Sequence, residues 1–90
     1  MSGVRGKLPG RGREGMMHLR SVDPDQNRYR WYSMSLQYTI MGGVDLVCRW
    51  GRIGSQGRGI IYPFSDLQEA RKGMARIARR RFGHGYSVSG

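Results

Sequence analysis

The chain has 90 residues and a mass of 10.2 kDa, which fits one small domain and excludes two. Its 16 Lys and Arg side chains outnumber 6 Asp and Glu, and the net charge of +10 favours polyanionic partners, nucleic acid or an anionic membrane surface. Cys48 is the only cysteine, which excludes a disulfide framework and indicates a reduced compartment. No segment is long enough to span a bilayer, so we expect no membrane partner and a cytoplasmic location, with nucleoid association left open.

The first 14 residues contain three apolar side chains, separated by glycines and a proline. Such a segment buries too little apolar surface to offset the entropy of ordering. We therefore predict a flexible, basic Gly/Arg-rich tail over residues 1–14 and a folded domain over residues 15–90. The tail has the composition to contact phosphates, although a solvated tail is the simpler interpretation.

Alternating and turn-forming residues predict a series of short strands. A first strand over Met16–Val22 ends at the turn cluster Asp23–Asp25. Bulky residues alternate with polar ones from Tyr32 to Ile40, and this period of two places Tyr32, Met34, Leu36, Tyr38 and Ile40 on a core face. Gly42-Gly43 supplies the positive φ angles of a tight hairpin, which returns as a strand over Val44–Trp50.

The return strand has two distinct faces. Leu46, Cys48 and Trp50 fall on one face, and Val47 and Arg49 on the other. We therefore expect Cys48 to be a small buried residue and not a nucleophile.

A further strand and a helix complete the predicted fold. Ile60–Tyr62 is predicted as a strand, and Ser65 with Gln68 forms a capping box that starts a helix. The helix carries an apolar stripe and ends at Gly83 and Gly85; the stripe comprises Leu67, Ala70, Met74, Ile77 and Ala78. Strands followed by one helix predict an α+β domain, an antiparallel sheet of four to five strands with one C-terminal helix on one face.

The run Trp50-Gly51-Arg52-Ile53-Gly54-Ser55-Gln56-Gly57 combines an aromatic ring, a guanidinium and a glycine-rich turn. These groups suit a stacked sugar or base, a phosphate, and close approach of an anion to the backbone. The alternative is a purely structural role for these residues, because a Trp at a strand end usually belongs to the core and glycines between strands are usually turn residues.

The same run resembles the signature of the WGR domain, which is named for its first three residues. The resemblance extends from about residue 16 to the end of the chain, through Asp23–Asn27, Tyr32, Gly42-Gly43, Leu46-Val47, Arg49 and Gly85-Tyr86. Two positions depart from the family pattern: Arg81 stands where many members have Lys, and Arg58 where Gln is common.

The resemblance implies a nucleic-acid-binding module related to the WGR domain of poly(ADP-ribose) polymerases, with a preference for DNA ends or nicks. It implies that Trp50, followed by Gly51, stacks on the terminal sugar, that Arg52 contacts phosphate or links parts of the domain, and that Asn27 makes a polar contact nearby. The polymerase catalytic domain does not fit in this chain, so we expect no enzymatic activity and no cofactor. A protein-interaction or regulatory module and an RNA-binding protein remain the alternatives.

Other basic residues extend the candidate interface. Arg58 follows the glycine-rich turn, and one helix face carries Lys72, Arg76, Arg79 and Arg80. These charges suit the binding of a phosphate backbone. The alternative is a solvated helix face that binds no ligand. No metal site is expected, because Cys48, His18 and His84 are scattered singles and a tetrahedral zinc site needs four ligands.

Overall fold

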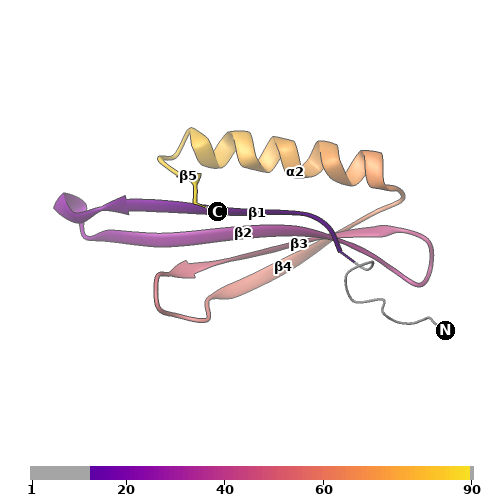
Figure 1. Cartoon of the computed structure of the whole chain (residues 1–90), viewed down its shortest axis with the longest axis horizontal. Coiled ribbons are helices and arrows are strands. Elements are labelled where there is room, and N and C mark those ends of the chain that lie inside the picture. Colours follow the sequence, from indigo (N-terminus) through magenta and orange to yellow (C-terminus); the bar gives the residue numbers. More distant parts are fainter. Residues whose placement is uncertain (1–12, 90) are drawn as a thin grey trace.

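The computed structural model describes residues 13–89 and shows an antiparallel sheet with one α-helix across one face (Figure 1). The elements are β1 (Arg13–Asp23), the 3-10 helix η1 (Pro24–Gln26), β2 (Arg28–Tyr38), β3 (Val44–Arg52), β4 (Arg58–Phe64), α2 (Leu67–Phe82) and β5 (Ser87–Val88). The strands lie in the order β4-β3-β2-β1-β5. The predicted α+β architecture is confirmed. Within the described residues, no helix is long and apolar enough to cross a membrane.

β1, β2 and β4 begin before their predicted first residues, whereas β3 begins at Val44 as predicted. β1 begins at Arg13 and β2 at Arg28, because the two strands pair along their whole length from Arg13–Gln37 to Asp23–Arg28. The predicted tail lies outside the described residues up to residue 12. Its last two residues, Arg13 and Glu14, belong to β1.

The connection between β2 and β3 corrects two predictions. It spans residues 39–43, so it is not a tight hairpin, and Ile40 is 101% exposed instead of lying on the core face. Tyr38, the last residue of β2, is 49% exposed, so its predicted core position is also wrong. Gly42 adopts the positive φ of 93°, whereas Gly43 is needed for space, since a Cβ there would lie 2.7 Å from the Phe64 carbonyl oxygen.

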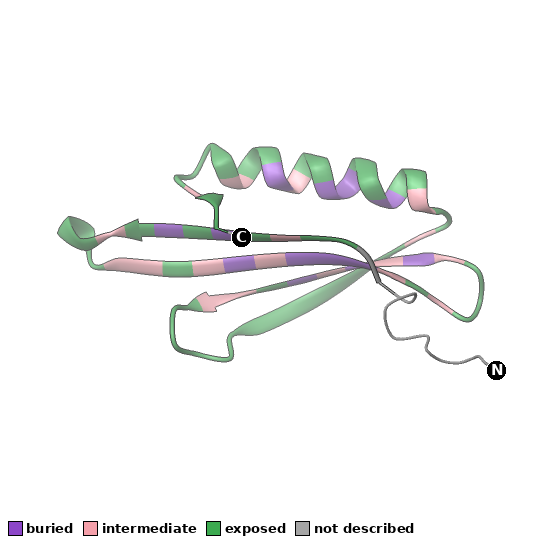
Figure 2. Cartoon of the chain, viewed as in Figure 1, coloured by how far each residue is buried: buried purple, intermediate pink, exposed green. Residues whose placement is uncertain are grey.

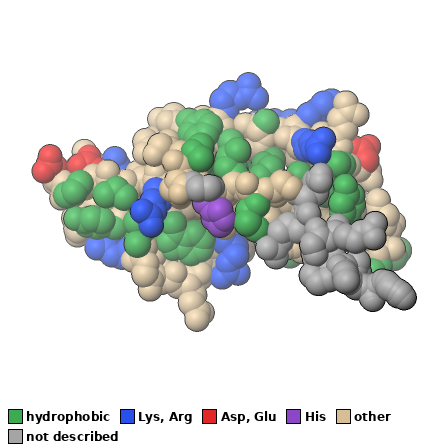
Figure 3. Space-filling view, viewed as in Figure 1, with side chains coloured by type: hydrophobic (Ala, Val, Ile, Leu, Met, Phe, Trp, Pro, Cys, Tyr) green, Lys and Arg blue, Asp and Glu red, His purple; other side chains and the backbone are tan. Residues whose placement is uncertain are grey.

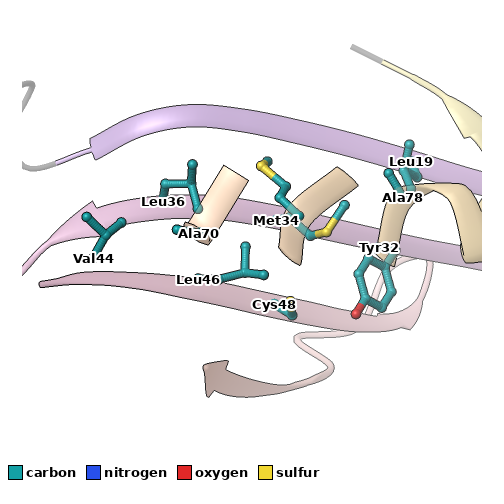
Figure 4. Close-up of a cluster of buried hydrophobic side chains, with 10 residues drawn as sticks. Leu19, Tyr32, Met34, Leu36, Val44, Leu46, Cys48, Ala70 and Ala78 are labelled. Carbon is teal, nitrogen blue, oxygen red and sulfur yellow. The ribbon is translucent and has the colours of Figure 1, made fainter. Parts of the chain in front are cut away.

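The core lies between α2 and the sheet face that it covers (Figure 2). α2 contributes Ala70, Gly73, Met74 and Ala78 to this layer, with Leu67 and Ile77 partly buried beside them. Leu36, Leu46 and Cys48 meet the helix from β2 and β3 (Figure 4). Cys48 is fully buried, as predicted.

The start of α2 differs from the predicted capping box by one residue. Asp66, not Ser65, is the N-cap, and its Oδ1 accepts a hydrogen bond of 2.8 Å from the backbone N–H of Glu69. We expect Asp66→Ala to lower the free energy of unfolding by about 1 kcal/mol, because it leaves that amide without its partner. Ser65→Ala is the control, with an expected change below about 0.5 kcal/mol. Urea unfolding of both variants would contradict this assignment if Ser65→Ala were the more destabilising.

Candidate nucleic-acid interface

A pocket of about 300 Å³ lies where the ends of β3 and α2 meet the start of β2. We call it the Trp50 pocket, and it is lined by Asn27, Tyr29, Arg30, Trp50, Gly51, Arg52, Arg81 and Tyr86. Three of these residues carry a guanidinium group and none carries a carboxylate. The pocket is therefore suited to an anion that also presents a flat or apolar surface.

Trp50 reaches this pocket because β3 alternates. Leu46 and Cys48 point into the core beneath α2, and Trp50, two residues further on, lies on the same face, as predicted. Its ring stacks on Tyr32 with centroids 5.8 Å apart and an interplanar angle of 12°. Tyr86 in turn meets the Tyr32 ring edge-on at 6.2 Å. Trp50 thus packs against the core and lines the pocket at once, so the two interpretations of this residue are compatible.

Arg81 is a pocket residue that the sequence did not single out as a binding residue. Its Cζ lies 4.4 Å from the centroid of the Tyr32 ring, so α2 directs this guanidinium toward the sheet. Its Nε is buried and has no hydrogen-bond partner within residues 13–89. Arg81 follows Ile77 by four residues and Ala78 by three, so the helical spacing of the apolar stripe was the signal that could have identified it.

Asn27 and Arg52 contact one another in the lining of the pocket. The Arg52 guanidinium donates to Asn27 Oδ1 at 3.4 Å, and its Cζ lies 5.6 Å from the centroid of the Tyr29 ring. Asn27 occupies the left-handed conformation, with φ 52° and ψ 42°, where the 3-10 helix ends. Asn tolerates this conformation better than most residues, so the turn itself brings its amide beside Arg52.

The other predicted site residues lie outside the Trp50 pocket. Arg58 is the ladder partner of Trp50 on β4, but it is exposed and does not line the pocket. Lys72, Arg76, Arg79 and Arg80 are exposed on α2, and basic side chains are visible along the top of the molecule in Figure 3. Lys72 pairs with Glu69 at 3.4 Å. The structure therefore brings together Asn27, Trp50, Gly51 and Arg52 and separates these four from the other five.

The glycines after Arg52 close the β3–β4 turn and do not line the pocket. Gly57 has a φ of 68°, and a Cβ there would collide with the carbonyl oxygen of Trp50. Gly51 is equally confined, since its Cβ would lie 2.7 Å from the Cα of Gly57. Ser55 completes the turn by donating from Oγ to the Arg52 carbonyl at 2.7 Å. These contacts match the turn interpretation of the glycines.

Burial disfavours the ionisation of Tyr32 and Cys48, the two weakly acidic side chains beside the pocket. Desolvation is the main cause that raises the pKa of Tyr32 to about 12, with a smaller contribution from Cys48, while Arg81 opposes the shift. Desolvation also raises the pKa of Cys48 above its usual value of 9.0. Both groups are neutral near pH 7, so they do not offset the positive charge of the arginines.

A comparison with models of known protein families identifies the family of this chain. The model of the WGR domain family matches residues 16–90, which includes both the pocket and the helix. The chain belongs to the WGR domain family. The WGR domain is a binding domain and not a catalytic one, and it binds nucleic acid in proteins of the poly(ADP-ribose) polymerase type.

One curated relative of this WGR protein is the uncharacterized protein y4dW of Sinorhizobium fredii. It is 29% identical over 70 residues, which cover 78% of this chain and 34% of the relative. The chain therefore spans about a third of the length of that relative. No solved structure gives a significant match.

Proposed function

We propose that this WGR protein is a non-enzymatic module that holds the 5′-phosphorylated end of a DNA strand, at a break or a nick, in the Trp50 pocket. One observation carries the proposal: the pocket joins a supported indole ring to three guanidinium groups with no carboxylate in its lining. An aromatic surface beside fixed cations is the combination that recognises a phosphorylated nucleotide.

Each pocket residue has a role in this proposal. Trp50 stacks on the terminal sugar or base, and Tyr32 behind it keeps the ring from turning away. Arg52 and Arg81 bind the phosphate oxygens through their terminal guanidinium nitrogens. Asn27 holds the Arg52 guanidinium and adds an amide donor. All of these contacts are to features that every 5′-phosphorylated end shares, so we expect low sequence specificity.

The basic residues outside the pocket act through the general positive field. Arg58, Arg76, Arg79 and Arg80 are exposed, so they attract the phosphate backbone without fixing the position of an end. Their removal lowers affinity for all DNA forms alike, whereas changes in the pocket affect ends.

Asn27→Asp tests the pocket with little change of shape. Asp tolerates the left-handed conformation, and the new carboxylate lies beside Arg52, where it repels a phosphate and occupies the guanidinium. We expect the affinity for a 5′-phosphorylated DNA hairpin to fall by about 10- to 100-fold. Gln26→Glu is the matched control, because it adds the same charge one residue away at an exposed position outside the lining.

The comparison uses the phosphorylated hairpin, its 5′-hydroxyl form and closed circular duplex DNA. Asn27→Asp is expected to abolish the preference for the phosphorylated form and to leave the affinity for the circle within about threefold of the Gln26→Glu control. Equal losses in both variants would contradict the pocket assignment. Tighter binding to a structured RNA would support the RNA-binding alternative, and the lack of salt dependence would support a protein partner instead.

A further inference from the structure

α2 covers one face of the sheet and leaves the other face uncovered (Figure 1). The uncovered face carries a second aromatic and basic surface. Residues directly opposite one another in an antiparallel pair share a face. Leu19, Tyr32 and Trp50 form one such row, and this row faces α2. The next row along the strands, Arg20, Trp31 and Gly51, therefore faces the other way.

Trp31 is held in place on this helix-free face. Its Nε1–H donates to the carbonyl oxygen of Arg52 at 3.0 Å. Gly51, its neighbour on β3, has no side chain, and a Cβ on Gly57 would lie 2.7 Å from Cζ2 of the indole. The ring borders a hollow of about 310 Å³, to which His18 and Arg20 also contribute. A flat ring is thus fixed beside a guanidinium.

Arg49 provides a second cation on the same face. It is the ladder partner of Ser33, two residues along β2 from Trp31 and therefore on the same face, and its guanidinium donates to the Gln56 carbonyl at 3.0 Å. Arg49 borders another hollow, of about 380 Å³, over β3 and β4. Arg20 and Arg49 lie two strands apart, about 10 Å across the sheet, with β2 and Trp31 between them.

We propose that this helix-free face is a second binding site, which takes an internal segment of single-stranded nucleic acid. A base stacks on Trp31, and the flanking phosphates bind Arg20 and Arg49. The surface favours this occupant because it pairs cations with an aromatic ring. The carboxylate of Asp45 is on the same face, but it lies four residues along β3 from Arg49, so it does not pair with the cations beside Trp31. The site is separate from the Trp50 pocket and needs no strand end.

Closed circular single-stranded DNA is the probe, because it offers no end to the Trp50 pocket. The chain has two tryptophans, so Trp50→Phe leaves Trp31 as the only indole fluorophore. We expect the circle to quench the fluorescence of Trp31 in this variant by stacking. Saturable binding with no change in Trp31 fluorescence would overturn the proposal, as would quenching by an acidic peptide but not by the circle.

A pair of double variants provides a test that leaves both tryptophans intact. Arg20→Ala with Arg49→Ala removes the two cations of the helix-free face, and Arg76→Ala with Arg80→Ala removes the same charge from the exposed side of α2. We expect the first pair to weaken binding of the circle by about tenfold and to make the logarithmic salt dependence shallower by about 1.4. The affinity for a phosphorylated duplex hairpin is expected to change equally in both pairs. Equal losses for the circle would overturn the helix-free site without affecting the proposal for the Trp50 pocket.

Discussion

Leu46→Ala is expected to lower the free energy of unfolding by about 2 to 5 kcal/mol. Leu46 is 0% exposed, and it lies in the middle of β3 between Leu36 on β2 and Tyr62 on β4. Truncation removes the buried methyl groups and leaves a cavity beneath α2, where both the sheet and the helix resist collapse. Chemical unfolding followed by circular dichroism measures the change.

Ile61→Ala is the control for that experiment. Ile61 lies on the neighbouring strand β4, but it is 56% exposed, so we expect a loss below about 1 kcal/mol. If the two variants were equally destabilised, the assignment of the buried face of β3 would be wrong. That result would also remove the basis for placing Trp50 on the side of α2.

Gly57→Ala is expected to cost roughly 3 kcal/mol of folding stability. Two effects add here: the φ of 68° is strained for a residue with a Cβ, and the new methyl group would collide with the Trp50 carbonyl oxygen. The same methyl group would lie 2.7 Å from the ring of Trp31. Relief of these collisions requires the β3–β4 turn to move away from the end of β3, so the Trp50 pocket is distorted as well.

Gly42→Ala separates the backbone strain from the collision. Gly42 also has a positive φ, of 93°, but a Cβ at this position would meet no atom within 4 Å. We expect this variant to lose only the strain energy, roughly 1 to 2 kcal/mol. Thermal unfolding measures the stability of both variants. Equal losses for Gly42→Ala and Gly57→Ala would show that the Cβ at Gly57 meets no collision and that the β3–β4 turn is not confined.

The strands could be predicted because their alternation reflects burial on one face, but alternation carries no information on where a strand leaves the sheet. Ile40 continues the pattern of β2 by spacing alone and lies in the turn. The helix start was displaced by one residue for a similar reason. Both Ser65 with Gln68 and Asp66 with Glu69 fit a capping pattern, and only the backbone conformation at Asp66 distinguishes them.

The sequence predicted the strand residues of the candidate site better than its helix residue. Trp50 and Arg52 are close to one another in a recognisable run, and Asn27 came from the resemblance to the WGR family. The spacing of Arg81 from Ile77 and Ala78 places it on the side of α2 that faces the sheet, but its contact with the pocket also depends on how α2 crosses the sheet. Arg79 and Arg80 were selected for their charge, yet they are exposed and outside the pocket lining.

The central claim, that the Trp50 pocket receives a phosphorylated strand end, is tested most directly by the indole resonances in a two-dimensional NMR titration. The chain has two tryptophans, and the Nε1–H of Trp31 is already bonded to the Arg52 carbonyl. With a 5′-phosphorylated hairpin, we expect the Trp50 indole and Arg81 Nε–H signals to shift, and the 5′-hydroxyl hairpin to shift them much less. An unmoved Trp50 signal at saturation, with shifts confined to the amides around Arg76 and Arg79, would contradict the claim.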